Sequence, residues 1–340
     1  MANTWLDFLA ASGAQLAESR VQHFGQPQAE LVAAAEGDVM ADLSHLGLLE
    51  LTGEDTQAFL QGQLTNDIKL LNGSNSEYAG YCTAKGRLLA TLLLWKQGDA
   101  HYAQLDGGIT PAIMKRLGMF VLRSKVKIAD ASTAKVRIGL SGKNAEAGLS
   151  VVFPTIPAQP HQLVVHNETA LLRLPGIMPR FEIVVPVDAA SALWNQLAAK
   201  FKPVGSAVWE WLEIRAGVPQ VTAGTQEEFV PQMLNLDLLG GISFNKGCYT
   251  GQEIVARTHY LGKVKRRTHL AHTTATSVAP GDKIFGTDTA EPVGLIVNAA
   301  AAVQGGFEVL AEIRLESVEA GPIRLEDGSV LELRDLPYGL

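Results

Sequence analysis

The cysteine at position 248 has the residue type and the sequence setting that thiol chemistry requires. Thr250 is followed three residues later by Glu253 and then by apolar residues, which is the pattern of a helix capping box. The spacing predicts a helix that begins near Gly251. Unpaired N–H groups at a helix N-terminus stabilise a thiolate, and Lys246 adds a positive charge two residues before the cysteine. We therefore predict that Cys248 is nucleophilic and that Lys246 assists it; the alternative is a small buried apolar side chain beside a turn.

A dense group of basic residues surrounds this cysteine. Six basic residues stand against a single acidic one, Glu253, between positions 246 and 267, which gives this segment a net charge of +5. The basic residues are Lys246, Arg257, Lys263, Lys265, Arg266 and Arg267. Such a segment predicts an anionic partner, either a polyglutamyl tail, a phosphate group or RNA. The alternative is a solvated helix end and strand edge without a ligand.

The elements that must position this segment are mixed. Alternating and continuous apolar patterns predict strands over Tyr78–Thr83, Leu88–Lys96, His101–Leu105, Lys135–Leu140, Leu163–Val165, Ala170–Leu174 and Phe181–Val187. Helical spacing predicts helices over Pro111–Leu122, Ala189–Lys200 and from Ser206 onward. This alternation is typical of an α+β region with ferredoxin-like layers. From about Lys263 short apolar runs alternate with turn residues, which predicts a separate small all-β module.

Two local patterns concern helix ends and tryptophans. Thr52, followed by a glycine and two acidic residues, predicts a helix N-cap, and Gly62 predicts the end of that helix. Gly262 similarly predicts the end of the helix after Cys248. Trp209 and Trp211 lie on the helix that follows Ser206, and taken alone they are expected to be core residues. Because they fall on different faces of that helix, the alternative is that one of them stacks on a flat ring.

The composition places limits on these hypotheses. The chain has 340 residues, a formal net charge of −7 and two cysteines, Cys82 and Cys248. An acidic chain does not coat nucleic acid along its whole surface, and two cysteines provide no disulfide framework. The longest dense apolar run, Leu88–Trp95, is far shorter than the roughly 20 residues that cross a bilayer. We expect a cytoplasmic protein with free thiols, of which Cys82 is structural.

Other candidate motifs are incomplete. Residues 139–144 follow a strand and contain Gly-Lys, but they lack the full glycine spacing of a phosphate loop, and Asn144 replaces its Ser or Thr. His269 and His272 do not share a face of a strand, and the two cysteines are distant, so we predict no metal site.

Several motifs together resemble one known family. The segment Lys246-Gly247-Cys248-Tyr249-Thr250-Gly251-Gln252-Glu253 closely resembles the signature of the YgfZ family of folate-binding proteins. Further matching segments are Leu60–Asp67, Ala84–Arg87, Arg215–Pro219, Phe229–Gln232, Asn235–Leu236, Gly240–Phe244 and Leu336–Tyr338. These segments span most of the chain in the order that the family shows.

The resemblance implies a fold like that of the T-protein of the glycine cleavage system. We therefore expect an aminomethyltransferase-like folate-binding domain over residues 1–262 and a C-terminal β-barrel over residues 263–340. The expected ligand is folate, in a tetrahydrofolate form. The expected role is the assembly or maintenance of iron–sulfur clusters in client enzymes, including tRNA-modifying ones, so that any contact with tRNA is indirect.

The resemblance also assigns site residues. The functional thiol of the family corresponds to Cys248, and a folate-contacting tryptophan corresponds to Trp209. A second aromatic folate contact falls at Leu46, where this chain departs from the family pattern. We also assign four residues in and just after the motif to the folate site: Tyr249, Gln252, Glu253 and Arg257.

One absence distinguishes this chain from aminomethyltransferases of the T-protein type. Those enzymes carry an acidic residue shortly after a Gly-Gly turn, whereas residues 86–92 here contain no carboxylate. Whether the protein is an enzyme is left open. Two alternatives to cluster maintenance remain: a folate-dependent aminomethyl transferase, and an RNA-binding scaffold that uses the basic residues of segment 246–267.

Overall fold

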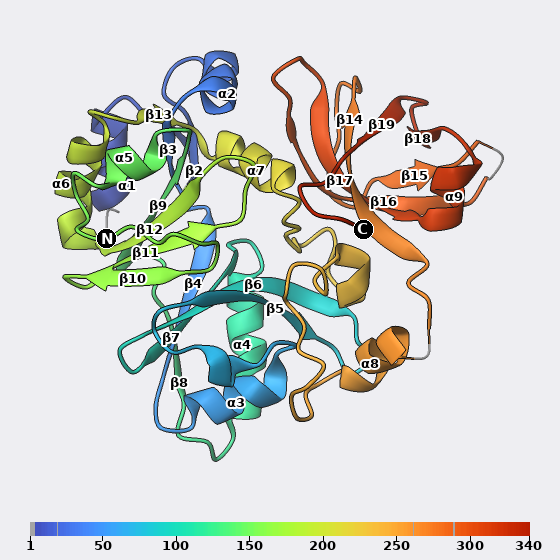
Figure 1. Cartoon of the computed structure of the whole chain (residues 1–340), viewed down its shortest axis with the longest axis horizontal. Helices are drawn as coiled ribbons and strands as arrows, with labels where there is room; N and C mark the ends of the chain where they lie inside the picture. The colour runs from blue at the N-terminus through green and yellow to red at the C-terminus, as the bar shows by residue number, and fades with distance from the viewer. Residues whose placement is uncertain (1–3, 19, 261, 288–289) are drawn as a thin grey trace.

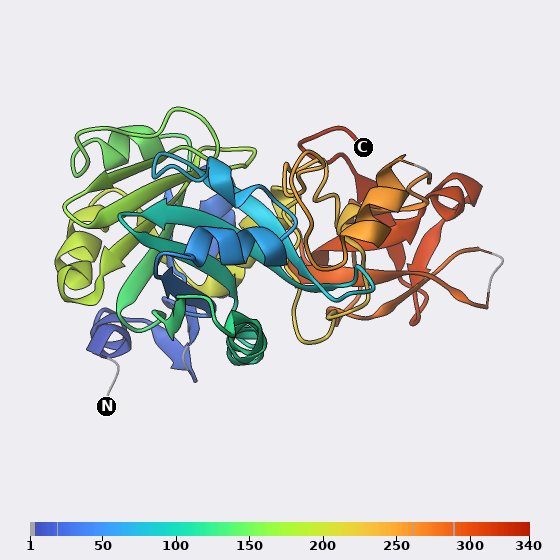
Figure 2. The same cartoon turned by 90° about the horizontal axis from the view of Figure 1, so that it is seen from below.

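The fold consists of two stacked sheets beside a closed barrel (Figure 1). The computed structural model describes residues 4–18, 20–260, 262–287 and 290–340. Blue to green elements form the sheets, and orange to red elements form the barrel at the other end of the molecule (Figure 2). No helix in the described ranges is long and apolar enough to cross a membrane.

The first sheet has one face covered by helices. Its strands lie in the order β5 (Ser76–Cys82), β6 (Leu88–Gln97), β7 (Ala100–Asp106), β4 (Leu46–Thr52) and β8 (Lys127–Asp130). Side chains of α3 (Thr56–Gln63) and α4 (Thr110–Val121) form a hydrophobic core with its outer face. Because side chains alternate along a strand, the other residues of β5 to β7 point toward the second sheet.

The second sheet is built in the same way. Its strands lie in the order β10 (Leu163–His166), β11 (Thr169–Leu174), β12 (Arg180–Pro186), β9 (Lys135–Ser141), β3 (Val39–Asp42) and β13 (Lys202–Val204). Its outer face packs on α1 (Thr4–Ala11), α5 (Ala145–Leu149) and α6 (Val187–Leu197). The hairpin of β1 (Gln15–Ala17) and β2 (Arg20–His23) and helix α2 (Pro27–Glu36) lie beside β13 and α7 (Ser206–Arg215).

A central core joins the two sheets to the barrel. It contains Trp95 from the first sheet, Leu172 from the second and Trp209 from α7, together with Leu310 from the barrel. The barrel order is β14 (Arg266–Thr273), β17 (Phe307–Arg314), β16 (Pro292–Ala301), β15 (Lys283–Phe285), β18 (Ile323–Leu325) and β19 (Val330–Arg334). Helix α9 (Leu315–Ala320) follows β17. The α+β class and the small C-terminal barrel that we predicted are therefore present.

The segment after the last strand fastens the barrel to the rest of the chain. The hydroxyl of Tyr338 donates a hydrogen bond to the carbonyl of Gly217, at 2.6 Å, just beyond the end of α7. The short helix η2 (Pro231–Leu234) ends at Asn235, whose side-chain amide donates to the Thr268 carbonyl in β14 at 2.8 Å. The barrel is thus tied to the central core near both of its ends.

Most predicted elements are present within a few residues, and one predicted helix start is wrong. Thr52 is the last residue of β4, where it pairs with Lys127, and α3 begins only at Thr56. Gly53, with a φ of +119°, forms the turn between the strand and the helix. Only glycine fits at this position, because a Cβ would lie 2.0 Å from the Lys125 carbonyl oxygen. Gly62 lies inside α3 and does not end it.

Candidate functional site

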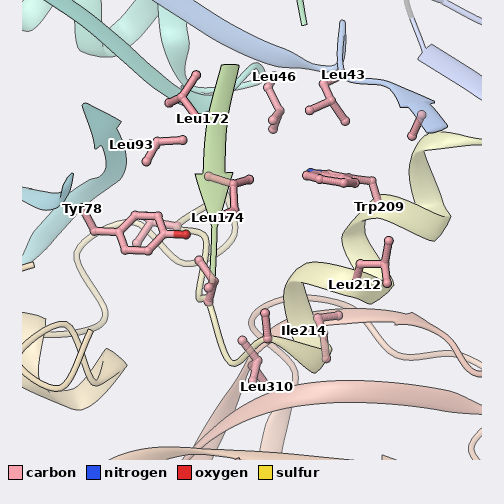
Figure 3. Packing of buried hydrophobic residues seen from close by; sticks show 14 of the residues in the cluster. Leu43, Leu46, Tyr78, Leu93, Leu172, Leu174, Trp209, Leu212, Ile214 and Leu310 are labelled. Atoms are coloured by element: carbon pink, nitrogen blue, oxygen red, sulfur yellow. The ribbon is translucent and has the colours of Figure 1, made fainter. Parts of the chain in front are cut away.

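A cavity of about 370 Å³ lies between the sheets, α7 and the barrel. Polar side chains that line it are Arg20, His45, Tyr78, Thr91, Gln104, Asp106, Glu182, Glu210, Glu213, Gln220, Thr222 and Asn298. Its apolar wall includes Leu46, Leu93 and Leu174 together with Trp209. Figure 3 shows these side chains converging from α7 and from both sheets. A volume of a few hundred cubic ångströms is typical of small-molecule sites.

Trp209 holds a fixed position in this cavity wall. Its ring lies against the backbone of β9 at Gly139, where an added Cβ would come within 2.6 Å of the ring. The Arg180 guanidinium lies over the ring at 4.7 Å from its centroid, and the same guanidinium pairs with Glu213. Within the described residues, nothing accepts a hydrogen bond from the buried indole Nε1. The indole therefore keeps one unused donor.

Glu182 places a carboxyl group in the cavity, between the two sheets. It is fully buried because the alternation along β12 directs it, like Val184, to the inner face. Its Oε2 accepts a hydrogen bond of 3.0 Å from the Gln104 amide, while Oε1 has no partner in the described part of the chain. Burial raises the pKa of this carboxyl to about 7, although the nearby Arg137 and Arg180 oppose that shift. An unpaired buried carboxyl oxygen favours a ligand that donates hydrogen bonds.

Further polar groups line the cavity beside Leu46. His45 has two buried ring nitrogens that no described residue hydrogen-bonds, and burial lowers the pKa of its imidazole to about 3. Asp106 lines the same cavity, and burial raises the pKa of its carboxyl. Arg20 and Glu210, also in the lining, form an ion pair of 2.6 Å. Because of its lowered pKa, the His45 imidazole is neutral and available as a donor or an acceptor of hydrogen bonds.

Cys248 lies outside this cavity, on an exposed loop before α8 (Gln252–Tyr260). The loop is held by the backbone, since the Thr250 N–H donates to the Gly62 carbonyl at 3.3 Å. Gly251, with a φ of +84°, packs against the β5–β6 turn, and a Cβ there would lie 2.5 Å from the Thr83 carbonyl oxygen. Gly251 also lies close to Gly86 of that turn, where an added Cβ would lie 3.3 Å from the Gly251 carbonyl oxygen. Two of the sequence motifs therefore pack directly on each other.

Lys246 is buried beneath this loop, with 9% of its surface exposed. Its Nζ donates to the carbonyls of Leu64, at 2.7 Å, and Asn66, at 2.5 Å. Leu64 is the C-cap of α3, so the ammonium group also neutralises the negative end of that helix dipole. Burial lowers the pKa of the Lys246 ammonium group to about 8, and the negative charges of Asp67 and Glu77 oppose this shift. The side chain thus anchors the loop to α3.

The other motif residues assigned to folate lie around this loop. Tyr249 is buried, with its ring 5.1 Å from the Lys246 Nζ. Gln252, Glu253 and Arg257 project from α8 and, like Tyr249, are not among the residues that line the cavity. Their role in folate binding stays a prediction. Of the predicted residues, Trp209 and Leu46 alone are brought together in the cavity lining.

The basic segment divides into residues that are paired within the protein and residues that are exposed. Arg266 pairs with Glu312 at 2.9 Å, and Arg267 makes a bidentate pair with Asp237. With Lys246 bound to carbonyls, three of the six cations are engaged within the protein. The remaining three, Arg257, Lys263 and Lys265, are exposed.

The cavity residues Glu182, Gln104, His45 and Asp106 were missed in the sequence. A single carboxyl inside the apolar strand Phe181–Val185 was the available signal, because an unpaired charge is rarely buried in a strand.

The absence of a carboxylate in residues 86–92 has a structural counterpart. Thr91 lines the cavity there, and its Oγ1 accepts a hydrogen bond from the Val221 N–H at 3.0 Å.

Comparison with known proteins defines the class first. The family model described as the GCVT N-terminal domain matches residues 8–242. The crystal structure of glycine cleavage system aminomethyltransferase T from Bartonella henselae superposes with a TM-score of 0.82 at 18% identity, covering 97% of this chain and 96% of that one. The chain therefore has the T-protein-like fold of the GCVT domain.

Closer relatives narrow this class. The tRNA-modifying protein YgfZ of Photorhabdus laumondii is 32% identical over 311 residues, which cover 88% of this chain and 92% of that protein. The tRNA-modifying protein YgfZ of Serratia proteamaculans is 32% identical over 307 residues, with the same coverage. The chain belongs to the YgfZ family.

Proposed function

We propose that this chain binds a reduced folate in its cavity and supports the assembly or repair of iron–sulfur clusters in cytoplasmic client enzymes, including tRNA-modifying ones. The observation that carries the folate part is that the Glu182 Oε1 and the Trp209 indole Nε1, both without a partner in the described chain, belong to the lining of one cavity. A pterin ring is flat and presents an N–H and an amino group on one edge. A carboxylate accepts hydrogen bonds from such an edge, and an unpaired indole N–H donates one to a ring nitrogen or carbonyl oxygen.

The cavity residues suit such a ligand in other respects. The apolar side chains of Leu46, Leu93 and Leu174 exclude water from the ring, while His45 and Gln104 offer further hydrogen bonds. The folate would supply the one-carbon or redox chemistry of a reduced pterin. The residues of this chain would orient it and hold its polar edge.

Cys248 is the proposed reacting thiol toward client proteins. Its exposure lets the sulfur reach another protein, as a nucleophile or as a transient iron ligand, which Cys82 with 1% exposure does not allow. Burial raises the pKa of the Cys82 thiol to about 12, so that it stays protonated. The names of the YgfZ relatives, tRNA-modifying proteins, support a connection with tRNA modification.

The test compares the two cysteines in cells that lack the gene. We expect Cys248→Ala to reduce the activity of an iron–sulfur tRNA-modifying enzyme to the level of the empty vector, and Cys82→Ala to retain it. Folate affinity, measured on the purified proteins by tryptophan fluorescence with tetrahydrofolate, should be the same for both variants. Full enzyme activity with Cys248→Ala would refute the thiol role, and absence of folate binding by the unaltered protein would refute the folate role.

A further inference from the structure

Helix α8 contributes His259 and Tyr260, and the preceding loop contributes Phe244, to an aromatic cluster that is separate from the cavity. Phe244 stacks on His259 with ring centroids 3.7 Å apart and planes at 13°. Tyr260 stands edge-on to His259, at 4.8 Å and 80°, and 63% of its surface is exposed. The helix lies at the periphery of the molecule, below the barrel (Figure 1). The side chains of Tyr260 and His259 are therefore exposed to solvent, whereas Phe244 supports them from the edge of the central core.

Three exposed cations accompany these rings. Arg257 lies one turn before Tyr260 on α8, and Lys263 and Lys265 follow the helix. The nearby carboxylates of Asp237 and Glu312 do not cancel this charge, because Arg267 and Arg266 already pair with them. Glu253, an exposed carboxylate one turn before Arg257 on α8, offsets one of the three charges and leaves a balance of +2. The α8 surface, which we define as Phe244, His259, Tyr260, Arg257, Lys263 and Lys265, is therefore both aromatic and net positive.

We propose that the α8 surface binds single-stranded RNA, with phosphates on its cations and a base stacked on its exposed rings. Cations alone would suit any anionic partner. Rings interleaved with cations are what proteins use to hold unpaired nucleotides, because each base has a flat face and each linkage a negative charge. An acidic protein surface would use the three cations but would have no need of the exposed Tyr260 ring. The proposal does not rest on folate binding or on the Cys248 thiol.

The test separates the electrostatic and the stacking contributions. The full-length protein is titrated into a fluorescein-labelled single-stranded RNA of about 12 nucleotides, a length that covers one such surface, and binding is followed by anisotropy at several salt concentrations. Three phosphate contacts on a single strand predict a slope of log K against log salt of about −2. Lys263→Glu with Lys265→Glu should reduce that slope by more than half. Tyr260→Ala should weaken binding about tenfold or more and leave the slope unchanged.

Matched controls come from α4 and the turn just after it, and α4 lies apart from α8 (Figures 1 and 2). Lys115→Glu with Arg123→Glu makes the same charge change, and Phe120→Ala removes another exposed ring; all three residues are exposed. These variants should bind RNA like the unaltered protein. Equal weakening by the α4 charge pair, or no effect of Tyr260→Ala, would overturn the proposal. So would displacement of the RNA by polyglutamate at a lower concentration than by unlabelled RNA, which would indicate an acidic polypeptide partner.

Discussion

The cavity and the Cys248 loop differ in how their polar groups are satisfied. In the cavity, Glu182, Trp209 and His45 each keep a buried polar atom without a partner in the described chain. In the loop, the buried Lys246 ammonium is bound by two backbone carbonyls. Leaving a buried polar group unpaired is unfavourable by about 1–3 kcal/mol, which a bound molecule can recover. The difference indicates that the cavity is shaped for a ligand and that the buried part of the loop is shaped for its own stability.

The two regions also differ in how they are encoded. The loop comes from one continuous motif, and neighbouring motifs support it: Thr65 donates to the Gly241 carbonyl, and Asn66 to the carbonyls of Gly240 and Tyr78. The cavity is assembled from strands of both sheets (β4, β5, β6, β7, β11 and β12), from α7 and from the barrel, and no single element supplies more than four of its residues. The recognisable motifs are thus largely those that hold loops together, whereas the proposed ligand contacts are dispersed.

Replacing Trp209 gives the largest expected effect, because this side chain belongs both to the cavity wall and to the central core. Trp209→Ala should destabilise the protein by about 3–5 kcal/mol in urea unfolding, since it removes a fully packed indole. Loss of the unpaired indole N–H and of the cavity wall should lower tetrahydrofolate affinity about a hundredfold. The rate at which iodoacetamide alkylates Cys248 in the folded protein should not change. A changed alkylation rate would show that the two regions are coupled.

Lys246→Met is the corresponding change in the loop. It leaves two carbonyls at the end of α3 without their donor, so we expect a loss of about 2–4 kcal/mol in the free energy of unfolding. Tetrahydrofolate affinity, measured well below the unfolding transition, should stay unchanged. Lys85→Met, at an exposed lysine of the adjoining turn, provides the control and should be neutral. Weakened folate binding in Lys246→Met alone would instead place Lys246 in the folate site.

Two glycines of the same motif test the contact between the loop and the β5–β6 turn. Gly251→Ala should cost about 1–3 kcal/mol, because its φ is +84° and a Cβ would lie 2.5 Å from the Thr83 carbonyl oxygen. Gly247→Ala is the matched control, as no atom lies within 4 Å of the position of its Cβ. Thermal unfolding of both variants distinguishes them; equal melting temperatures would contradict the close contact.

The pH dependence of stability should report the buried carboxyl of Glu182. Burial raises the folded-state pKa of its carboxyl from 4.5 to about 7, so the folded protein retains a proton that the unfolded chain loses between these values. Stability therefore falls as pH rises through this window, by at most about 1.4 kcal/mol per pH unit for one group. Glu182→Gln should remove that dependence. The measurement is the difference in urea unfolding free energy between the two proteins at pH 5 and pH 7; a difference that does not vary with pH would contradict the shift.

The sequence was sufficient for most elements because their patterns are local. Helical spacing locates α4, α6 and α7, and alternation locates β9 and β12. Thr52 misled because its cap-like setting competes with pairing to Lys127 across β4 and β8, which is a tertiary contact. The cavity was out of reach for the same reason. Glu182 and Gln104 are 78 residues apart and meet only because the two sheets stack.

The hydrogen bond from Tyr338 to Gly217 has a consequence for any shortened form of this protein. It secures a barrel whose Asn298 and Ala299 form part of the cavity lining. A fragment that stops at residue 262 would retain both sheets, α7 and the thiol loop, but its cavity would be open on one side. The two modules are separate in their strand pairing, yet a single small molecule in the cavity would touch both.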